Sequence, residues 1–295
     1  MVLLIAMFAT VSAFGQGQTI YNSIPAPLPG NVVSLGYEAT STAEFGDRVQ
    51  FAGTFRKVSK VTQTMSSWGC EAGSWYAGNC TTTPGASFTH PLTLNIYNVG
   101  PGDAVGSLIT SVTQNFSIPY RPTADSINCA GGRWYNVADS TCYNGYAVNV
   151  TFDLPAVTFP NEVIYGIAYD TTHYGAAPIG ESAPCFTSSG GCGYDSLNVG
   201  LDGITSVGVN PAPDDAYFSS TYAPFYCDLG AGGFGFFRLD AGCWTGYKPS
   251  VTFYAVNPPA NANACKNGGW RTLTRLDGTT FRNQGDCIQY VNNGH

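Results

Sequence analysis

The sequence predicts an all-β protein built as a β-sandwich, most simply a jelly roll. Charged residues make up only 11% of the chain, whereas Gly (36), Tyr (18) and Phe (17) are abundant. This composition is typical of strands and tight turns rather than of helices with charged faces. Apolar and polar residues alternate in many windows, and none carries a sustained helical stripe. The 295 residues are enough to bury a large core.

The alternating windows predict about ten strands separated by Gly, Pro and Asn turns. The windows 90–100 and 107–118 flank the turn-forming segment PGDAVG (101–106), so they are expected to form a hairpin. The apolar residues expected on its inner face are Leu92, Leu94, Ile96, Leu108, Val112, Phe116 and Ile118. Six further windows carry the same pattern: 45–55, 58–68, 147–154, 162–170, 196–201 and 250–256.

The N-terminus begins with an apolar run, MVLLIAMFATVSAFGQGQ. The run is too short to span a bilayer and ends in small residues, so residues 1–17 are predicted to be a secretory signal peptide. The basic start of such signals is missing, which leaves a short membrane anchor or a core strand as alternatives. No other apolar run approaches the length of a transmembrane span.

Ten cysteines occur as five close couples, each enclosing a loop-like stretch of Gly, Asn, Ser and aromatic residues. Nearest neighbours are predicted to pair, although other connectivities stay open on sequence alone. Each bridge should stabilise its loop by about 2–3 kcal/mol. Disulfides and a signal peptide together predict a secreted, extracellular protein. The predicted pairs are Cys70–Cys80, Cys129–Cys142, Cys185–Cys192, Cys227–Cys243 and Cys265–Cys287.

No cofactor is expected. The chain has no Cys-x-x-Cys pair and only three histidines, a pattern that disfavours zinc. A structural calcium ion is an alternative without support, because the acidic residues lack an EF-hand spacing. The net charge of −7 offers no basic surface for nucleic acid, which is therefore not expected as a partner. The acids considered for calcium are Glu44, Asp47, Asp202, Asp214 and Asp215.

Three patterns resemble catalytic motifs, but none of them is favoured as a catalytic site. Gly230 to Gly235 matches G-x-G-x-x-G, yet it lies between two cysteines and lacks the βαβ context of a dinucleotide site. Asp170 and His173 form the one close acid–imidazole couple, and a turn closed by Asp170 is the preferred explanation. Glu44 with Asp47, and Asp214 with Asp215, lie too close in sequence to recommend them as a glycosidase pair.

Aromatic residues in the disulfide-closed loops are the strongest functional signal. Rings held in rigid loops can stack on sugar rings with little loss of entropy. The alternative is that they are buried and form the local cores that long loops need. The candidate residues are Trp68, Trp75, Tyr76, Trp134, Tyr135, Trp244 and Tyr247.

The C-terminus forms a different unit. Residues 257–264, NPPANANA, are predicted to be a linker between a β-sandwich domain (18–256) and a small disulfide-closed module (265–295). The Asp277-Gly278 pair predicts a β-hairpin turn within the module. Residues 259–295 carry a local charge of +2 in a chain of net −7. The module either packs on the sandwich as a cap or uses its basic face to contact an acidic neighbour, including another copy of the chain.

The strings CKNGGW and FRNQGDCIQYV in this module resemble a terminal module of secreted bacterial β-sandwich proteins of uncharacterised activity. The similarity is specific from Cys265 to Val291. It is looser in the body, where it rests on residues 41–70 and on IYGIAYDTTHYG (164–175). The resemblance implies a protein of the cell surface or extracellular matrix, and it implies no substrate and no catalytic residue.

Three functions follow as hypotheses. The favoured one is a secreted binding or adhesive protein without catalysis, whose partner is a glycan or another surface protein. The first alternative is a structural matrix or filament subunit that self-associates through edge strands or the C-terminal module. The second is a glycan-active hydrolase, which requires two carboxylates across a cleft.

Overall fold

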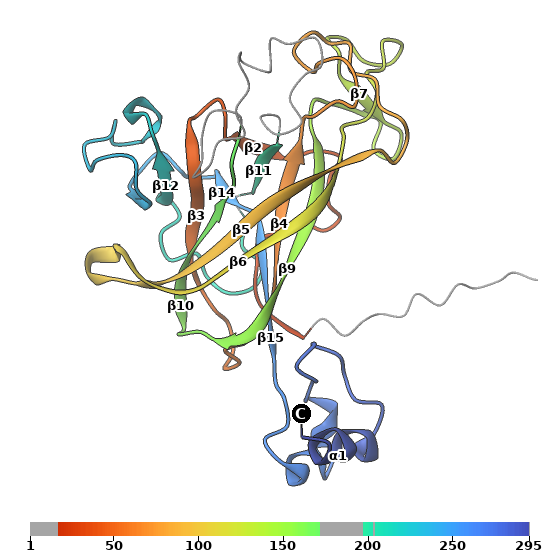
Figure 1. Ribbon diagram of the computed structural model, residues 1–295, viewed down its shortest axis with the longest axis vertical. Helices are drawn as coiled ribbons and strands as arrows, with labels where there is room; N and C mark the ends of the chain where they lie inside the picture. Colours follow the sequence, from red (N-terminus) through yellow and green to blue (C-terminus); the bar gives the residue numbers. More distant parts are fainter. Residues whose placement is uncertain (1–16, 172–196, 203, 295) are drawn as a thin grey trace, which may run out of the picture.

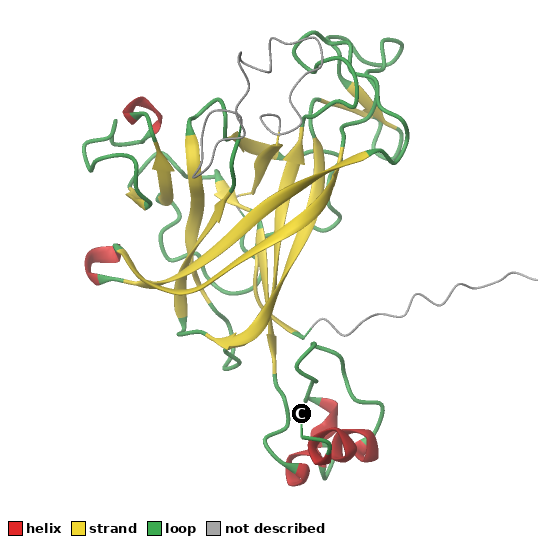
Figure 2. Cartoon of the chain, viewed as in Figure 1, coloured by secondary structure: helices red, strands yellow, loops and turns green. Residues whose placement is uncertain are grey.

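A computed structural model describes residues 17–171, 197–202 and 204–294. Strands dominate these residues, and helix is confined to 3₁₀ turns and a short C-terminal α-helix, so the all-β prediction is confirmed (Figure 2). Residues 1–16 of the predicted signal peptide (1–17), His173 and the Cys185–Cys192 pair lie outside the described residues. Within the described residues, no helix is both long and apolar enough to cross a membrane.

Eight strands form the two layers of the sandwich (Figure 1). They are β1 (Gln18–Asn22), β3 (Thr42–Gln50), β4 (Lys57–Ser67), β5 (Ser87–Val99), β6 (Val105–Pro119), β9 (Tyr146–Thr158), β10 (Glu162–Ala168) and β15 (Val251–Val256). In chain order, the first of these strands pairs with the last, the second with the second-last, and so on, always antiparallel. The pairs are β1 with β15, β3 with β10, β4 with β9, and β5 with β6. A chain folded back on itself and then wrapped produces this order, which is that of a jelly roll.

Shorter strands extend both layers. Beside β4, the first sheet continues through β11 (Leu197–Asp202) to β2 (Val33–Gly36) and β14 (Lys248–Pro249). Beside β3, the second sheet continues to β12 (Ala216–Ser220) and β13 (Arg238–Asp240). A separate ribbon pairs β7 (Trp134–Asn136) with β8 (Thr141–Tyr143). The 3₁₀ turns are η1 (Pro101–Asp103), η3 (Ala223–Phe225), η4 (Ala262–Cys265) and η5 (Gly269–Arg271).

The core lies between the two sheets, where the inward residues of each alternating strand meet. Phe253 of β15 packs edge-on against Tyr165 of β10, with ring centroids 5.6 Å apart. The Tyr165 hydroxyl also donates a hydrogen bond to the carbonyl oxygen of Pro249 in β14, 3.1 Å away. Apolar contact and this buried hydrogen bond therefore hold the two layers together.

A buried ion pair also connects the layers. Lys248 of β14 lies 3.3 Å from the Asp47 carboxylate of β3, and the two residues are 4% and 1% exposed. The Lys248 ammonium donates a second bond to the Ala212 carbonyl, while the Asn210 side chain donates to Asp47. Burial raises the pKa of Asp47 to about 6, although Lys248 and the hydrogen bonds act in the opposite direction.

The β5–β6 hairpin confirms the predicted pairing, with one correction. Leu108 was expected on the inner face, but it is 53% exposed. The ladder shifts register between Ile96 and Tyr97, and beyond this shift the hairpin extends past the core. Its tip reaches β12, where the Tyr217 hydroxyl donates to the Asp103 carbonyl at 2.6 Å.

A side chain bridges the edges of β6 and β9. The Gln114 amide nitrogen of β6 donates to the Asp153 carbonyl of β9 at 3.1 Å, and the Asp153 backbone N–H donates to the Gln114 amide oxygen at 3.2 Å. The side-chain amide thus binds the backbone of β9 as a neighbouring strand would.

Four predicted disulfides are present: Cys70–Cys80, Cys129–Cys142, Cys227–Cys243 and Cys265–Cys287. The last closes the C-terminal module, which has its own hydrophobic cluster around Cys265, Leu273, Phe281 and Cys287. In Figure 1 the module lies below the sandwich, beyond the end of β15.

The predicted hairpin of the module is reduced to one bridge, between Thr274 and Thr280. The residues after it form an α-helix, α1 (Gln284–Asn292), which sequence analysis missed. The Asn283 side chain caps this helix by accepting from the Asp286 N–H. One guanidinium nitrogen of Arg275 donates to both Asp286 carboxylate oxygens, at 2.7 and 2.8 Å. This ion pair neutralises one residue of the predicted basic face, which consists of Lys266, Arg271, Arg275 and Arg282.

We predict that Lys248→Met lowers the free energy of unfolding by about 3–5 kcal/mol, because it leaves the Asp47 carboxylate buried without its partner. The double variant Asp47→Asn/Lys248→Met should recover most of this loss, since it removes both charges. Urea unfolding of the four proteins of the cycle measures both effects. A Lys248→Met protein as stable as wild type would show that the pair contributes nothing.

We predict that deleting residues 259–295 leaves the thermal unfolding of the sandwich nearly unchanged, because the module has a separate cluster. The hydrogen bonds that join it to the rest of the chain include one from the Gly17 N–H to the Gly278 carbonyl and one from the Thr274 N–H to the Asn257 carbonyl. Differential scanning calorimetry of the truncated and full chains tests this. A large fall in the melting temperature would instead identify the module as a stabilising cap.

Candidate functional site

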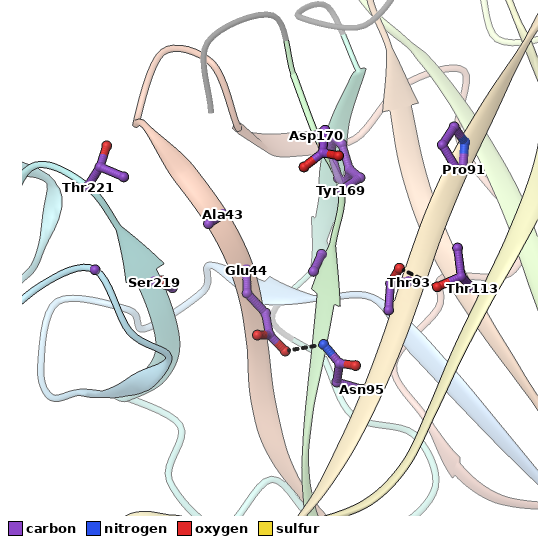
Figure 3. Close-up of a pocket in the computed structure, with 12 residues that line it drawn as sticks. Ala43, Glu44, Pro91, Thr93, Asn95, Thr113, Tyr169, Asp170, Ser219 and Thr221 are labelled. Carbon is purple, nitrogen blue, oxygen red and sulfur yellow. Dashed lines mark hydrogen bonds between the residues drawn. The ribbon is translucent and has the colours of Figure 1, made fainter. Parts of the chain in front are cut away.

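A groove of about 560 Å³ lies on the outer face of the second sheet. One cross-strand row forms its floor, and each residue in this row pairs with the next. Because side chains alternate between the faces of a sheet, all five point away from the core. The row consists of Ser219, Glu44, Ala168, Thr93 and Thr113, from β12, β3, β10, β5 and β6 (Figure 3).

The Glu44 side chain lies across the sheet and is held in place. Its carboxylate accepts a hydrogen bond from the Asn95 amide nitrogen at 3.0 Å, and from the Tyr97 hydroxyl at 3.0 and 3.3 Å. Gly166 makes this position accessible, because a Cβ atom there would lie 2.2 Å from a Glu44 carboxylate oxygen. Burial raises the pKa of Glu44, and the bonds from Asn95 and Tyr97 oppose this rise.

Beyond Asn95, the outer face of the sheet is covered rather than open. The Phe237 ring packs against Tyr97 and Tyr217, with centroids 5.5 and 6.1 Å away. Arg48 pairs with Glu162 and with Asp103 from the hairpin tip. Tyr97 contacts both Phe237 in this cover and the Glu44 carboxylate, so the cover closes the side of the groove next to Glu44.

The loop between β12 and β13 borders the groove and also carries exposed aromatic rings. Thr221 and Gly235 of this loop line the groove. Their neighbours Tyr222, Phe234 and Phe236 are 59%, 55% and 53% exposed. None of the three rings lines the groove itself, but their position next to lining residues in the sequence makes them candidates for contact with a ligand that extends beyond it.

Several contacts fix this loop. Cys227–Cys243 closes it, the Gly235 N–H donates to the Ser220 carbonyl, and Arg238 forms two 3.0 Å bonds to the Asp228 carboxylate. The predicted G-x-G-x-x-G stretch belongs to this loop and forms turns. Gly230, Gly233 and Gly235 all have positive φ, which glycine adopts without strain.

The seven predicted aromatics separate into two groups, and none of them lines the groove. Trp68, Trp75, Tyr76, Trp134 and Tyr135 belong to the two disulfide-closed loops at one end of the sandwich (Figure 1). These loops touch at Gly78 and Gly132. The contact is so close that a Cβ atom on Gly132 would lie 2.2 Å from the Gly78 Cα. Trp244 and Tyr247 follow the disulfide that closes the β12–β13 loop.

Their exposure differs widely. Trp134 and Trp244 are 5% and 8% exposed, and both indole N–H groups are bonded, to the Gly145 carbonyl and the Asp240 carboxylate. These two rings therefore act as core residues. Trp68, Trp75 and Tyr135 are half-buried, whereas Tyr76 and Tyr247 are exposed.

The half-buried rings do not form a flat platform. Trp68 meets Trp75 at 86°, and Trp75 meets Tyr76 at 89°. Such edge-to-face contacts are typical of a local aromatic cluster. Ligand binding by Trp68, Trp75, Tyr76, Tyr135 or Tyr247 stays a prediction.

The acidic residues considered for catalysis or calcium are mostly engaged elsewhere. Asp47 pairs with Lys248, Asp214 accepts from Thr245, and Asp215 accepts from the Gly242 N–H. Glu44 and Asp170 are the two acids that line the groove. The described residues contain no group of three or more His, Cys, Asp or Glu side chains arranged to hold a metal ion.

Comparison of the chain with protein-family models, with curated proteins and with solved structures finds no match. The geometry of the groove is therefore the basis for any functional conclusion.

We predict that Gly166→Ala displaces the Glu44 side chain and lowers the Glu44 pKa toward that of an ordinary glutamate, because the displaced carboxylate gains solvent. NMR titration of the carboxyl carbon measures this pKa. Gly36→Ala is the control, since a Cβ atom there makes only ordinary contacts of 3.5 Å or more. An unchanged Glu44 pKa in Gly166→Ala would contradict the proposed dependence on this glycine.

Proposed function

We propose that the protein is a secreted glycan-binding protein and that the groove on the β12-β3-β10-β5-β6 face is its binding site. The observation that carries this proposal is the fixed Glu44–Asn95 pair beside the Thr93 and Thr113 hydroxyls. A carboxylate accepts hydrogen bonds, and an amide both donates and accepts them. Neighbouring sugar hydroxyls, which also donate and accept, can bind such a combination. The positions of Glu44 and Asn95 are set before binding, which reduces the entropy that a ligand must lose.

The aromatic loop supports the same function. Tyr222, Phe234 and Phe236 offer apolar faces beside a polar floor, and a sugar ring combines hydroxyl edges with an apolar C–H face. A fixed loop keeps these rings available without ordering them on binding. We propose these three residues as a stacking surface beside the groove, while ligand binding by the predicted loop aromatics stays a separate prediction.

An extracellular location is consistent with the four described disulfides, which persist in oxidising compartments. The resemblance of the C-terminal module to secreted bacterial proteins favours a role at the cell surface or in the extracellular matrix. Self-association through that module stays an alternative; its exposed cations are Lys266, Arg271 and Arg282.

One observation favours hydrolysis as a second candidate. Glu44 and Asp170 line the same groove, and burial raises the pKa of Glu44, as a general acid requires. The binding function needs fewer assumptions, because it uses both residues as hydrogen-bond partners and requires no defined separation between them.

We predict that Asn95→Ala and Glu44→Gln each weaken glycan binding about ten-fold or more, since a hydrogen bond to a charged group contributes about 1.5–3 kcal/mol. A glycan array followed by calorimetry on the best ligand measures the loss. Tyr76→Ala is the matched control, because Tyr76 is exposed but lies outside the groove.

Equal losses in the Tyr76→Ala protein, or none in the two groove variants, would place binding elsewhere. Release of reducing sugar that Glu44→Gln abolishes would instead assign hydrolysis to the groove.

A further inference from the structure

The groove continues into a polar strip along the β5–β6 hairpin. Alternate residues of both strands point outward, and on this face each is small and uncharged. From Ser87 to Asn95 the strip is roughly 26 Å long, at about 3.3 Å per residue. Its residues are Ser87, Thr89, Pro91, Thr93 and Asn95 on β5, and Ser111, Thr113, Asn115 and Ser117 on β6.

Cross-strand hydrogen bonds hold the strip in one arrangement. Thr93 and Thr113 share a 2.8 Å bond, Ser111 donates to Asn95 at 2.7 Å, and Ser117 donates to Ser87 at 2.7 Å. A hydroxyl oxygen has two acceptor positions and one donor, so each paired group keeps capacity for a ligand. The strip is thus ordered and still able to bind.

Charge restricts the ligand further. Glu44 and Asp170 are the ionisable acids that line the groove, and none of its described lining residues is Lys, Arg or His. An anionic ligand would be repelled at close range without a compensating cation. An uncharged ligand meets hydrogen-bonding side chains along the strip, interrupted only by the ring of Pro91.

We propose that the ligand is an extended, uncharged polysaccharide chain, which enters the groove at Thr93 and Thr113 and runs along β5 and β6 toward Ser87 and Ser117. This inference rests on the proposed glycan-binding function, and it adds that the ligand is long, uncharged and aligned with β5 and β6. The far half of the strip, outside the groove, contacts only ligands long enough to reach it.

The experiment compares cello- and chito-oligosaccharides of increasing length, with galacturonan oligosaccharides of matched length as anionic probes. Affinity for the uncharged series should rise with length and then level off, and the anionic series should bind at least ten-fold more weakly. Thr89→Val/Ser117→Ala removes hydroxyls at the far end of the strip. It should weaken the longest bound oligomer about five-fold and leave the shortest unchanged.

Thr280→Val is the matched control, an exposed threonine in the C-terminal module. If affinity for the oligosaccharides does not depend on their length but is still lost in Asn95→Ala, the proposal of an extended chain is wrong, and the groove remains a glycan site. Tighter binding of galacturonan would overturn the charge selection. Failure of the wild-type protein to bind any oligosaccharide would overturn both the inference and the proposed function.

Discussion

The insertion of β15 between β1 and β4 is the interaction on which the rest of the structure depends. β15 pairs with β1 on one side and with β4 on the other, so the last strand of the sandwich closes the sheet that the first strand begins. Phe253 then reaches across to Tyr165 in the opposite layer. Because these contacts join residues far apart in the sequence, the core forms only when nearly the whole domain is in place.

This closure also determines the character of the groove. The inner face of the second sheet packs against the core, so polar side chains can occupy the part of its outer face that is not covered. The five strands in register bring residues 44, 93, 113, 168 and 219 into one row, although no two of them are close in sequence. The paired glycines Gly46 and Gly166 keep the next row low, so Glu44 can extend over it to Asn95.

Most long strands and the four described disulfides could be predicted from the sequence, because alternation and cysteine spacing are local signals. The sequence did not predict the groove. Glu44, Thr93 and Asn95 are ordinary polar positions in alternating strands, and only the tertiary register makes them neighbours. Tryptophans in loops attracted attention, but composition cannot distinguish Trp134, which fills a local core, from Phe234, which is exposed. In the module, the capping Asn283 was the overlooked helix signal.

The bridge between Gln114 and the backbone of Asp153 has a consequence for behaviour at high concentration. Long edge strands normally offer unpaired backbone groups to other molecules and promote fibre growth. Here the backbone N–H and C=O of Asp153 both form hydrogen bonds with the Gln114 side chain. A strand from another molecule would have to displace two hydrogen bonds to pair with β9 at this point. The bridge therefore protects this part of the β9 edge against strand-by-strand association between molecules.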